Sequence, residues 1–136
     1  MTTLTAFYEA VNSGDIDRVL DLQAEDVEWR GPQAFPDLTE PHHGHSGVRA
    51  YTARVGDAWR EFRVQPERFF DFGERVLVLA REHGCGRDSG VEVQHPTAHL
   101  WTLRDGLVVR FQVFWDREEG LREAGVTRRA ASPARS

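Results

Sequence analysis

The sequence predicts an α+β domain in which N-terminal helices pack against an antiparallel sheet. Apolar residues recur at helical spacing in the first half of the chain and alternate with a period of two in the second half. Glycine-containing turns separate consecutive strands, an order typical of antiparallel sheets rather than of β-α-β units. At 136 residues, of which 40% are hydrophobic, the chain suffices for one domain with its own core.

Three helices are expected before the sheet. The first covers residues 2–12, where one apolar stripe carries Leu4, Phe7, Tyr8 and Val11. Asp15 is placed to cap the second helix. A short strand over residues 27–30 and a loop over residues 32–47 precede the third helix. Its residues at helical spacing are Val48, Tyr51, Thr52, Val55, Trp59 and Phe62.

Four strands follow, and a short helix closes the domain. The period-two segments are residues 62–71, 75–83, 91–103 and 107–115. Asp116 is expected to cap the closing helix, with Glu119 reaching back toward it as in a capping box. The domain is therefore predicted over residues 1–126, with residues 127–136 as a disordered, solvated tail.

The turn at Arg104-Asp105-Gly106 sets which side chains share a face. A three-residue loop pairs Trp101 with Val109 and His99 with Phe111, and this register is preferred over a two-residue loop because it collects the large apolar side chains. One face then holds Thr97, His99, Trp101, Leu103, Val109, Phe111, Val113 and Trp115.

The opposite, convex face is also apolar. It carries Leu100, Val108 and Phe114 beside polar residues, which is too apolar a surface to lie bare in water. This pattern predicts a homodimer through the convex face.

Charge and composition argue against several classes of function. A net charge of −5 disfavours nucleic acid as a partner, because phosphate binding needs a clustered basic surface. The N-terminus lacks the pattern of a signal peptide and no stretch is long enough to cross a membrane, so a cytoplasmic location is predicted. Cys85 is the single cysteine, which excludes an internal disulfide, and is interpreted as a spectator thiol.

Four segments in order resemble the SnoaL-like domains of the nuclear transport factor 2-like superfamily. They are FYEAVNSGDID (7–17), GHSGVRAY (44–51), SGVEV (89–93) and HLWTLRDG (99–106). The resemblance covers residues 4–125. It implies a cone-shaped half-barrel with a deep pocket, usually dimeric, and a ketosteroid isomerase-like fold.

The catalytic sets of that superfamily are mostly missing. The tyrosine and the base of the steroid isomerases would fall on Phe7 and Gly31, so the resemblance does not imply that activity. The final aspartate of the limonene-epoxide hydrolases would fall on Val113. SnoaL-type cyclases use an acid/base aspartate in the pocket, and no inward acidic residue is expected on the last two strands. Fold alone does not determine function.

Histidines are the best candidates for chemistry. His99 is expected in mid-strand on the apolar face, where imidazole suits acid/base work near neutral pH. His43 is the second candidate, from a loop at the pocket mouth, although the pattern leaves open which of His42, His43 and His45 faces inward. Three histidines within four residues can seldom all reach one ion, so neither a metal nor another cofactor is expected.

Other residues stay undecided or are given lesser roles. His95 lies two pleats before His99, but Pro96 can shift the alternation. The orientation of Glu82 and His83 is open because the preceding residues are apolar on both faces. Tyr8 is rotated by about 100° from Phe7 around the helix, and is not expected to replace the missing tyrosine.

Bulky side chains predict a wall for a flat or polycyclic ligand. The expected substrate-binding residues are Trp29, Tyr51, Trp59, Trp101, Phe111, Val113 and Trp115.

The favoured function is cofactor-independent acid/base chemistry on an apolar, carbonyl-bearing small molecule. Cyclisation, isomerisation and dehydration all fit, because each moves a proton in a dry pocket. The first alternative is a non-catalytic small-molecule-binding or accessory protein. The second is a protein-interaction module that uses the convex sheet face and has a filled pocket.

Overall fold

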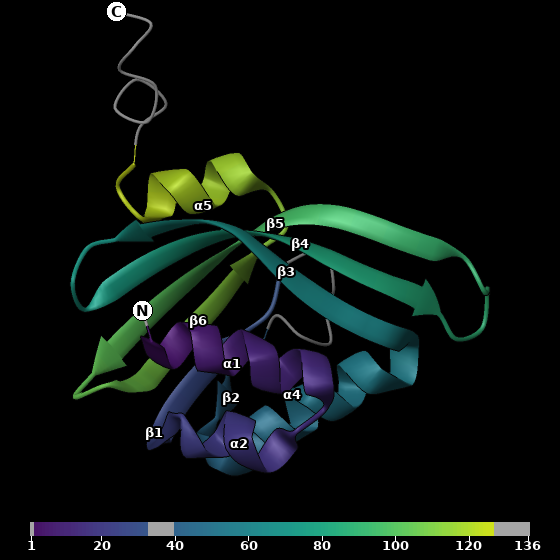
Figure 1. Cartoon of the computed structure of the whole chain (residues 1–136), viewed down its shortest axis with the longest axis horizontal. Coiled ribbons are helices and arrows are strands. Elements are labelled where there is room, and N and C mark those ends of the chain that lie inside the picture. Colours follow the sequence, from purple (N-terminus) through teal and green to yellow (C-terminus); the bar gives the residue numbers. More distant parts are fainter. Residues whose placement is uncertain (1, 33–39, 127–136) are drawn as a thin grey trace, which may run out of the picture.

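The computed structural model describes residues 2–32 and 40–126, which form one curved, open sheet with helices on both faces (Figure 1). The helices are α1 (Thr2–Ser13), α2 (Ile16–Asp21), α4 (Gly44–Ala58) and α5 (Arg117–Glu123). The strands are β1 (Gln23–Arg30), β2 (His42–His43), β3 (Trp59–Asp71), β4 (Arg75–Gly86), β5 (Glu92–Arg104) and β6 (Leu107–Phe114). The predicted α+β class is confirmed.

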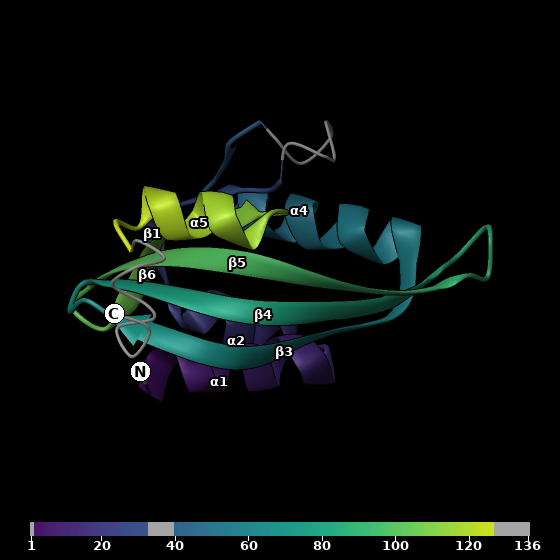
Figure 2. The same cartoon turned by 90° about the horizontal axis from the view of Figure 1, so that it is seen from above.

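The strand order in the described sheet is β2-β1-β6-β5-β4-β3. β1 runs parallel to β6, and the other neighbouring strands are antiparallel. The helices α1, α2 and α4 lie on the concave side, while α5 crosses the other face (Figures 1 and 2). This arrangement places the helices of the N-terminal half of the chain over the concave face of the long strands, while the end of the β4–β5 hairpin projects beyond α4 (Figures 1 and 2).

The first two helices form as the sequence predicts. The side chain of Asp15 accepts a hydrogen bond from the backbone nitrogen of Arg18 at 3.1 Å, which caps α2. In α1, the residues Leu4, Phe7 and Tyr8 are buried against the sheet. The apolar stripe therefore holds α1 on the concave face.

The third helix ends earlier than its apolar spacing predicts. It stops at Ala58, and Trp59 already has extended backbone angles as the first residue of β3. The β3–β4 register shifts between Arg60 and Arg63, and Glu61 has a φ of 52°. This bulge brings Trp59 and Phe62, three residues apart, to the cavity side. The three-residue spacing of Trp59 and Phe62, which the sequence pattern assigns to a helix, therefore arises from a bulge in β3.

The predicted register of the last hairpin is wrong. Arg104 pairs with Leu107 across a two-residue turn, in which Asp105 and Gly106 have φ of 53° and 79°. Positive φ at both turn residues matches the twist of the flanking strands.

A two-residue turn alone would place Trp101 and Phe111 on opposite faces of the sheet, but a bulge in the hairpin restores them to the same face. The register shifts between Thr102 and Leu103, so that Trp101 lies opposite Phe111 and His99 opposite Val113. The four side chains still share the concave face, as expected, but with different partners. Val108, expected on the convex face, belongs to the concave core instead.

A second apolar cluster lies on the convex side under α5. Leu77, Ala98, Leu100 and Phe114 from the sheet contact Leu121 and Ala124. Asp116 caps α5, as predicted, by accepting a hydrogen bond from the backbone nitrogen of Glu118 at 2.9 Å. Leu100 and Phe114, two of the residues that motivated the dimer prediction, are therefore covered by the chain's own helix. The homodimer through this face remains a prediction.

The central part of the loop predicted over residues 32–47 and the tail predicted over residues 127–136 lie outside the described residues. No helix in the described part of the chain is long and apolar enough to cross a membrane.

Candidate functional site

A cavity of about 660 Å³ lies between the concave face of the sheet and the helices α1, α2 and α4. Small-molecule sites typically have volumes of roughly 300–1,000 Å³. Its walls are mainly apolar, and the polar side chains contributed by the sheet include Glu82 from β4 together with His95 and His99 from β5. The cavity therefore combines the size of a ligand site with a few convergent polar groups.

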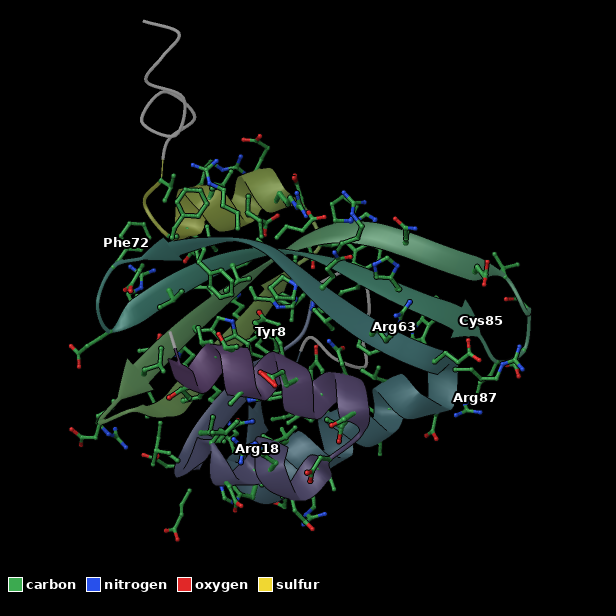
Figure 3. All side chains as sticks on the ribbon, viewed as in Figure 1. Tyr8, Arg18, Arg63, Phe72, Cys85 and Arg87 are labelled. Carbon is green, nitrogen blue, oxygen red and sulfur yellow. The ribbon has the colours of Figure 1, made fainter. Side chains whose placement is uncertain are left out.

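The ring of His99 is held between two other polar side chains. The Tyr8 hydroxyl lies 2.8 Å from Nδ1, and Glu82 Oε2 lies 3.0 Å from Nε2. His99 itself is only 3% exposed. Tyr8 points from α1 toward the sheet, and its hydroxyl therefore reaches the ring of His99 in the middle of β5 (Figure 3).

These contacts form one directed chain of hydrogen bonds when His99 is neutral. Trp101 Nε1 donates to the Tyr8 oxygen at 3.1 Å. Tyr8 then donates to Nδ1 of His99, and Nε2 donates to Glu82. Thr97 also donates to Glu82 Oε2, at 2.9 Å. Every donor hydrogen in this set is used within the protein, and the chain ends on a carboxylate.

Electrostatics favours the charged form of that carboxylate. Burial raises the pKa of Glu82, but the hydrogen bonds from His99 and Thr97 and the charges of His99 and His95 outweigh burial and bring the pKa below its ordinary value. Burial likewise raises the pKa of Tyr8, so its hydroxyl stays protonated and can donate. The part of the cavity wall beside His99 therefore carries a carboxylate that can accept a proton.

His43 does not reach the cavity. It lies on β2, opposite Glu28 of β1, and its Nδ1 is 4.0 Å from Glu28 Oε1 with a side chain that is 70% exposed. His42 packs edge-on against Tyr51, and His45 Nε2 contacts the backbone oxygen of Gln23 at 3.1 Å. None of the three histidines is among the described residues that line the cavity. The segment is fixed by strand pairing and by the start of α4, so it is no free loop at the mouth.

The described residues contain no group of three histidine, cysteine or acidic side chains that could hold a metal ion. Cys85 lies at the far end of β4, away from Tyr8 (Figure 3).

Most of the expected ligand-binding residues do line the cavity. They are Trp29, Tyr51, Trp59, Phe111, Val113 and Trp115. Trp101 is the exception: it is fully buried behind the wall, where its ring stacks on Phe111 with centroids 4.2 Å apart. Its role in the structure is to hold the Tyr8 hydroxyl. Trp29 is fixed in turn by a 2.6 Å hydrogen bond from its Nε1 to Gln23 Oε1.

Sequence reasoning missed two polar members of this site, Tyr8 and Glu82. Tyr8 was expected to turn away from the position of the missing tyrosine, yet its hydroxyl meets His99. The sequence did contain an indication of this role: Tyr8 lies on the apolar stripe of α1, and a buried tyrosine hydroxyl needs a hydrogen-bond partner. For Glu82 the signal was the β4–β5 register, which pairs it with His95 and so gives it the face of Thr97 and His99.

An open, curved sheet wrapped by N-terminal helices around such a cavity defines the class of α+β cone-shaped half-barrels. Residues 4–111 match the family model of the SnoaL-like domain, and the chain belongs to this family. The resemblance noted from the sequence is thereby confirmed. No curated protein matches the chain.

Solved structures of the same fold include proteins of moderate sequence identity. An NTF2-like protein of unknown function from Burkholderia pseudomallei has 31% identity and a TM-score of 0.80, over 90% of this chain and 94% of that chain. TerC, co-crystallised with polyporic acid, has 27% identity and a TM-score of 0.78, over 87% and 92%. A protein assigned as a polyketide cyclase from Xanthomonas campestris has 25% identity and a TM-score of 0.70, over 87% and 90%.

Proposed function

We propose that this protein is a cofactor-independent enzyme that moves a proton on an apolar, carbonyl-bearing small molecule, in a reaction of the cyclase, isomerase or dehydratase type. The observation that carries the proposal is the carboxyl group of Glu82 at the wall of an apolar cavity, held on one oxygen by His99 and Thr97.

Glu82 is the group of the site best placed to touch a ligand. Within the described residues, its hydrogen bonds all reach Oε2, so Oε1 is left for a ligand hydrogen. A carboxylate that faces an apolar cavity can accept a proton from a bound ligand as a general base. His99 contacts protein groups through both ring nitrogens. Its proposed role therefore changes from acid/base catalyst to the residue that positions Glu82 and stabilises its charge.

The cavity walls and the relatives support an aromatic or polycyclic ligand. Trp29 makes edge-to-face contacts with both Tyr51 and Phe111 along the wall, an arrangement that presents flat apolar surfaces. TerC was crystallised with polyporic acid, and the Xanthomonas relative is assigned as a polyketide cyclase. Both observations favour an organic ligand of this kind for the present cavity.

The test is a ligand screen followed by hydrogen–deuterium exchange. Polycyclic ketones, anthraquinones, terpenoid epoxides, steroids and polyporic acid are screened by thermal shift against the wild type, Glu82→Gln and the exposed control Glu92→Gln. A ligand at about 100 times its dissociation constant adds roughly 2.7 kcal/mol of stability. Ligands that bind are then followed by NMR in D₂O for exchange of carbon-bound hydrogens and for product formation.

We expect a ligand that stabilises all three proteins, with exchange or conversion in the wild type and in Glu92→Gln. Loss of a general base typically lowers the rate by 10²–10⁴-fold, so Glu82→Gln is expected to fall by that factor. Saturable binding without exchange or product from any ligand would instead identify a non-catalytic binding protein. No thermal shift with the whole panel would favour the protein-interaction alternative.

A further inference from the structure

His95 lies in the same cavity as Glu82 and has a fixed ring orientation. Its Nε2 is 2.9 Å from the backbone oxygen of Trp115, and its ring stacks on the Trp115 ring with centroids 3.6 Å apart and planes 8° apart. Both residues line the cavity. A carbonyl oxygen only accepts hydrogen bonds, so Nε2 carries the hydrogen.

This contact leaves the second ring nitrogen, Nδ1, open. No described residue forms a hydrogen bond with it, and no buried side-chain nitrogen or oxygen in the described chain lacks a partner. Nδ1 is therefore not sealed in the protein. It is available to a ligand either as an acceptor or, when the ring is protonated, as a donor.

The β4–β5 register places His95 directly opposite Glu82. Directly opposite residues of an antiparallel pair share a face, with Cβ atoms roughly 4.5–5.5 Å apart. Glu82 leans away along the strand, because its Oε2 contacts Thr97 and His99. A ligand between the two residues would therefore meet an open carboxylate oxygen on one side and an open imidazole nitrogen on the other.

We propose that His95 is the second catalytic acid/base residue of this site, donating a proton from Nδ1 while Glu82 accepts one. This inference rests on the proposed function. Glu82 takes a proton from the carbon next to the ligand carbonyl. The electron pair of that C–H bond forms a C=C bond, and the carbonyl oxygen takes the Nδ1 proton of the His95 imidazolium to give an enol.

Reversal at a different carbon completes the reaction. The Glu82 carboxylic acid returns its proton to a conjugated carbon, and the enol hydroxyl returns its proton to His95. Both residues regain their starting charges, and the double bond has moved into conjugation with the carbonyl without any co-reactant. The substrate class that follows is a β,γ-unsaturated, enolisable ketone with an apolar, ring-containing body, and the product is the conjugated ketone.

Several other charged or titratable groups face the same cavity and contribute to its pH response. Besides Glu82 they are Tyr8, Asp15, Arg49, Tyr51, Arg54, His83 and His99. The test variants must therefore change His95 alone. His95→Phe keeps a flat ring on Trp115 without a proton donor, His95→Gln keeps polarity without the ring, and the exposed His43→Gln serves as the matched control.

The kinetic test uses a β,γ-unsaturated ketone built on the ring scaffold that binds best in the panel. We expect both His95 variants to bind it within about threefold of the wild type, whereas conversion falls by 10²–10⁴-fold. The wild-type profile of kcat/KM against pH is expected to be bell-shaped, with an acid limb from Glu82 and an alkaline limb from His95. The alkaline limb should disappear in His95→Phe and persist in His43→Gln.

The possible failures are distinguishable. Full activity of Glu82→Gln would overturn the proposed function and this inference together. An inactive Glu82→Gln combined with an active, bell-shaped His95→Phe would overturn only the role of His95.

A second measurement needs no ligand. Nitrogen-15 NMR of labelled histidine, assigned by difference from His95→Phe, should show the neutral ring of His95 protonated on Nε2. Protonation on Nδ1 instead would overturn the inference.

Discussion

Glu82 Oε2 receives the Nε2 hydrogen of His99 at 3.0 Å, and the other carboxylate oxygen, Oε1, has no hydrogen-bond partner among the described residues. The opposite ring nitrogen of His99 is already engaged by the Tyr8 hydroxyl at 2.8 Å. A histidine bonded on both sides is held in one orientation and supports its neighbours. The relationship also ties α1, β4 and β5 together at the base of the cavity.

Replacing Tyr8 by Phe should destabilise the fold. The change removes the acceptor of the Trp101 indole hydrogen and the partner of His99 Nδ1, and both of these residues are buried. A buried polar group that loses its partner costs about 1–3 kcal/mol. We expect a loss in the free energy of unfolding within this range, measured by urea denaturation.

Tyr51→Phe is the matched control for that experiment. Tyr51 is also buried and lines the cavity, but no side-chain hydrogen bond from its hydroxyl is present in the described structure. Its loss should change the free energy of unfolding by less than about 0.5 kcal/mol. Equal effects of the two substitutions would show that the Tyr8 hydroxyl is not the organising group.

The depressed pKa of Glu82 predicts a specific pH dependence of stability. A carboxyl whose pKa is lower in the folded than in the unfolded state stabilises the fold above its unfolded value, near 4.5. That contribution disappears as the pH falls through the lower, folded value. The stability difference between wild type and Glu82→Gln should therefore shrink as the pH is lowered below about 4.5.

The measurement is a series of urea denaturations between pH 7 and pH 3. Glu92→Gln, on the exposed part of β5, should track the wild type through the whole range. A constant difference between wild type and Glu82→Gln at every pH would mean that Glu82 has no favourable folded-state partners, against the observed contacts with His99 and Thr97.

The fold was largely predictable from the sequence, because local patterns dominate its elements. The stripe of α1, the Asp15 and Asp116 caps and the period-two strands all depend on residues within a few positions of one another. The errors arose where two patterns coincide. Trp59 and Phe62 fit a helix by spacing and a bulged strand by structure, and the tertiary context selects the strand.

The site was less predictable, because its contacts join residues far apart in the chain. His99 was found from its place on an apolar face, but its partners Tyr8 and Glu82 lie 91 and 17 residues away. A one-residue change in strand register moves a side chain to the other face, so the orientation of Glu82 could not be fixed without the β4–β5 pairing. His43 illustrates the converse, since β2 pairing removes a histidine that a loose loop would have offered.

Arg117 should prove more important for stability than its position at the start of α5 indicates. Its guanidinium donates to the backbone oxygens of Thr97 at 3.2 Å and Ala80 at 2.7 Å. Pro66, opposite Ala80 in β3, has no backbone hydrogen to donate there. Arg117→Met leaves both carbonyls without these donors, and we expect a loss of about 1–3 kcal/mol in the free energy of unfolding.

Arg122→Met on the same helix is the control for Arg117→Met. Arg122 is exposed, and an exposed substitution of this kind typically changes stability by less than about 0.5 kcal/mol. Comparable losses in both variants would assign the effect to α5 as a whole, and would refute a specific role of the Arg117 contacts.

Packing of α5 on the convex face predicts opposite outcomes for two glycine-to-alanine changes. A Cβ at Gly120 would clash with the Cβ of Ala98 and approach the Phe114 ring to 3.3 Å. Gly120→Ala must therefore displace α5 from the cluster around Leu100, and overpacking of this kind costs about 1–3 kcal/mol. At Gly56, in α4, a Cβ would meet nothing within 4 Å, so Gly56→Ala should stabilise the helix by about 0.5–1 kcal/mol. Thermal and urea denaturation of the two variants should move in opposite directions, and a Gly120→Ala protein as stable as the wild type would show that α5 does not rest on Ala98.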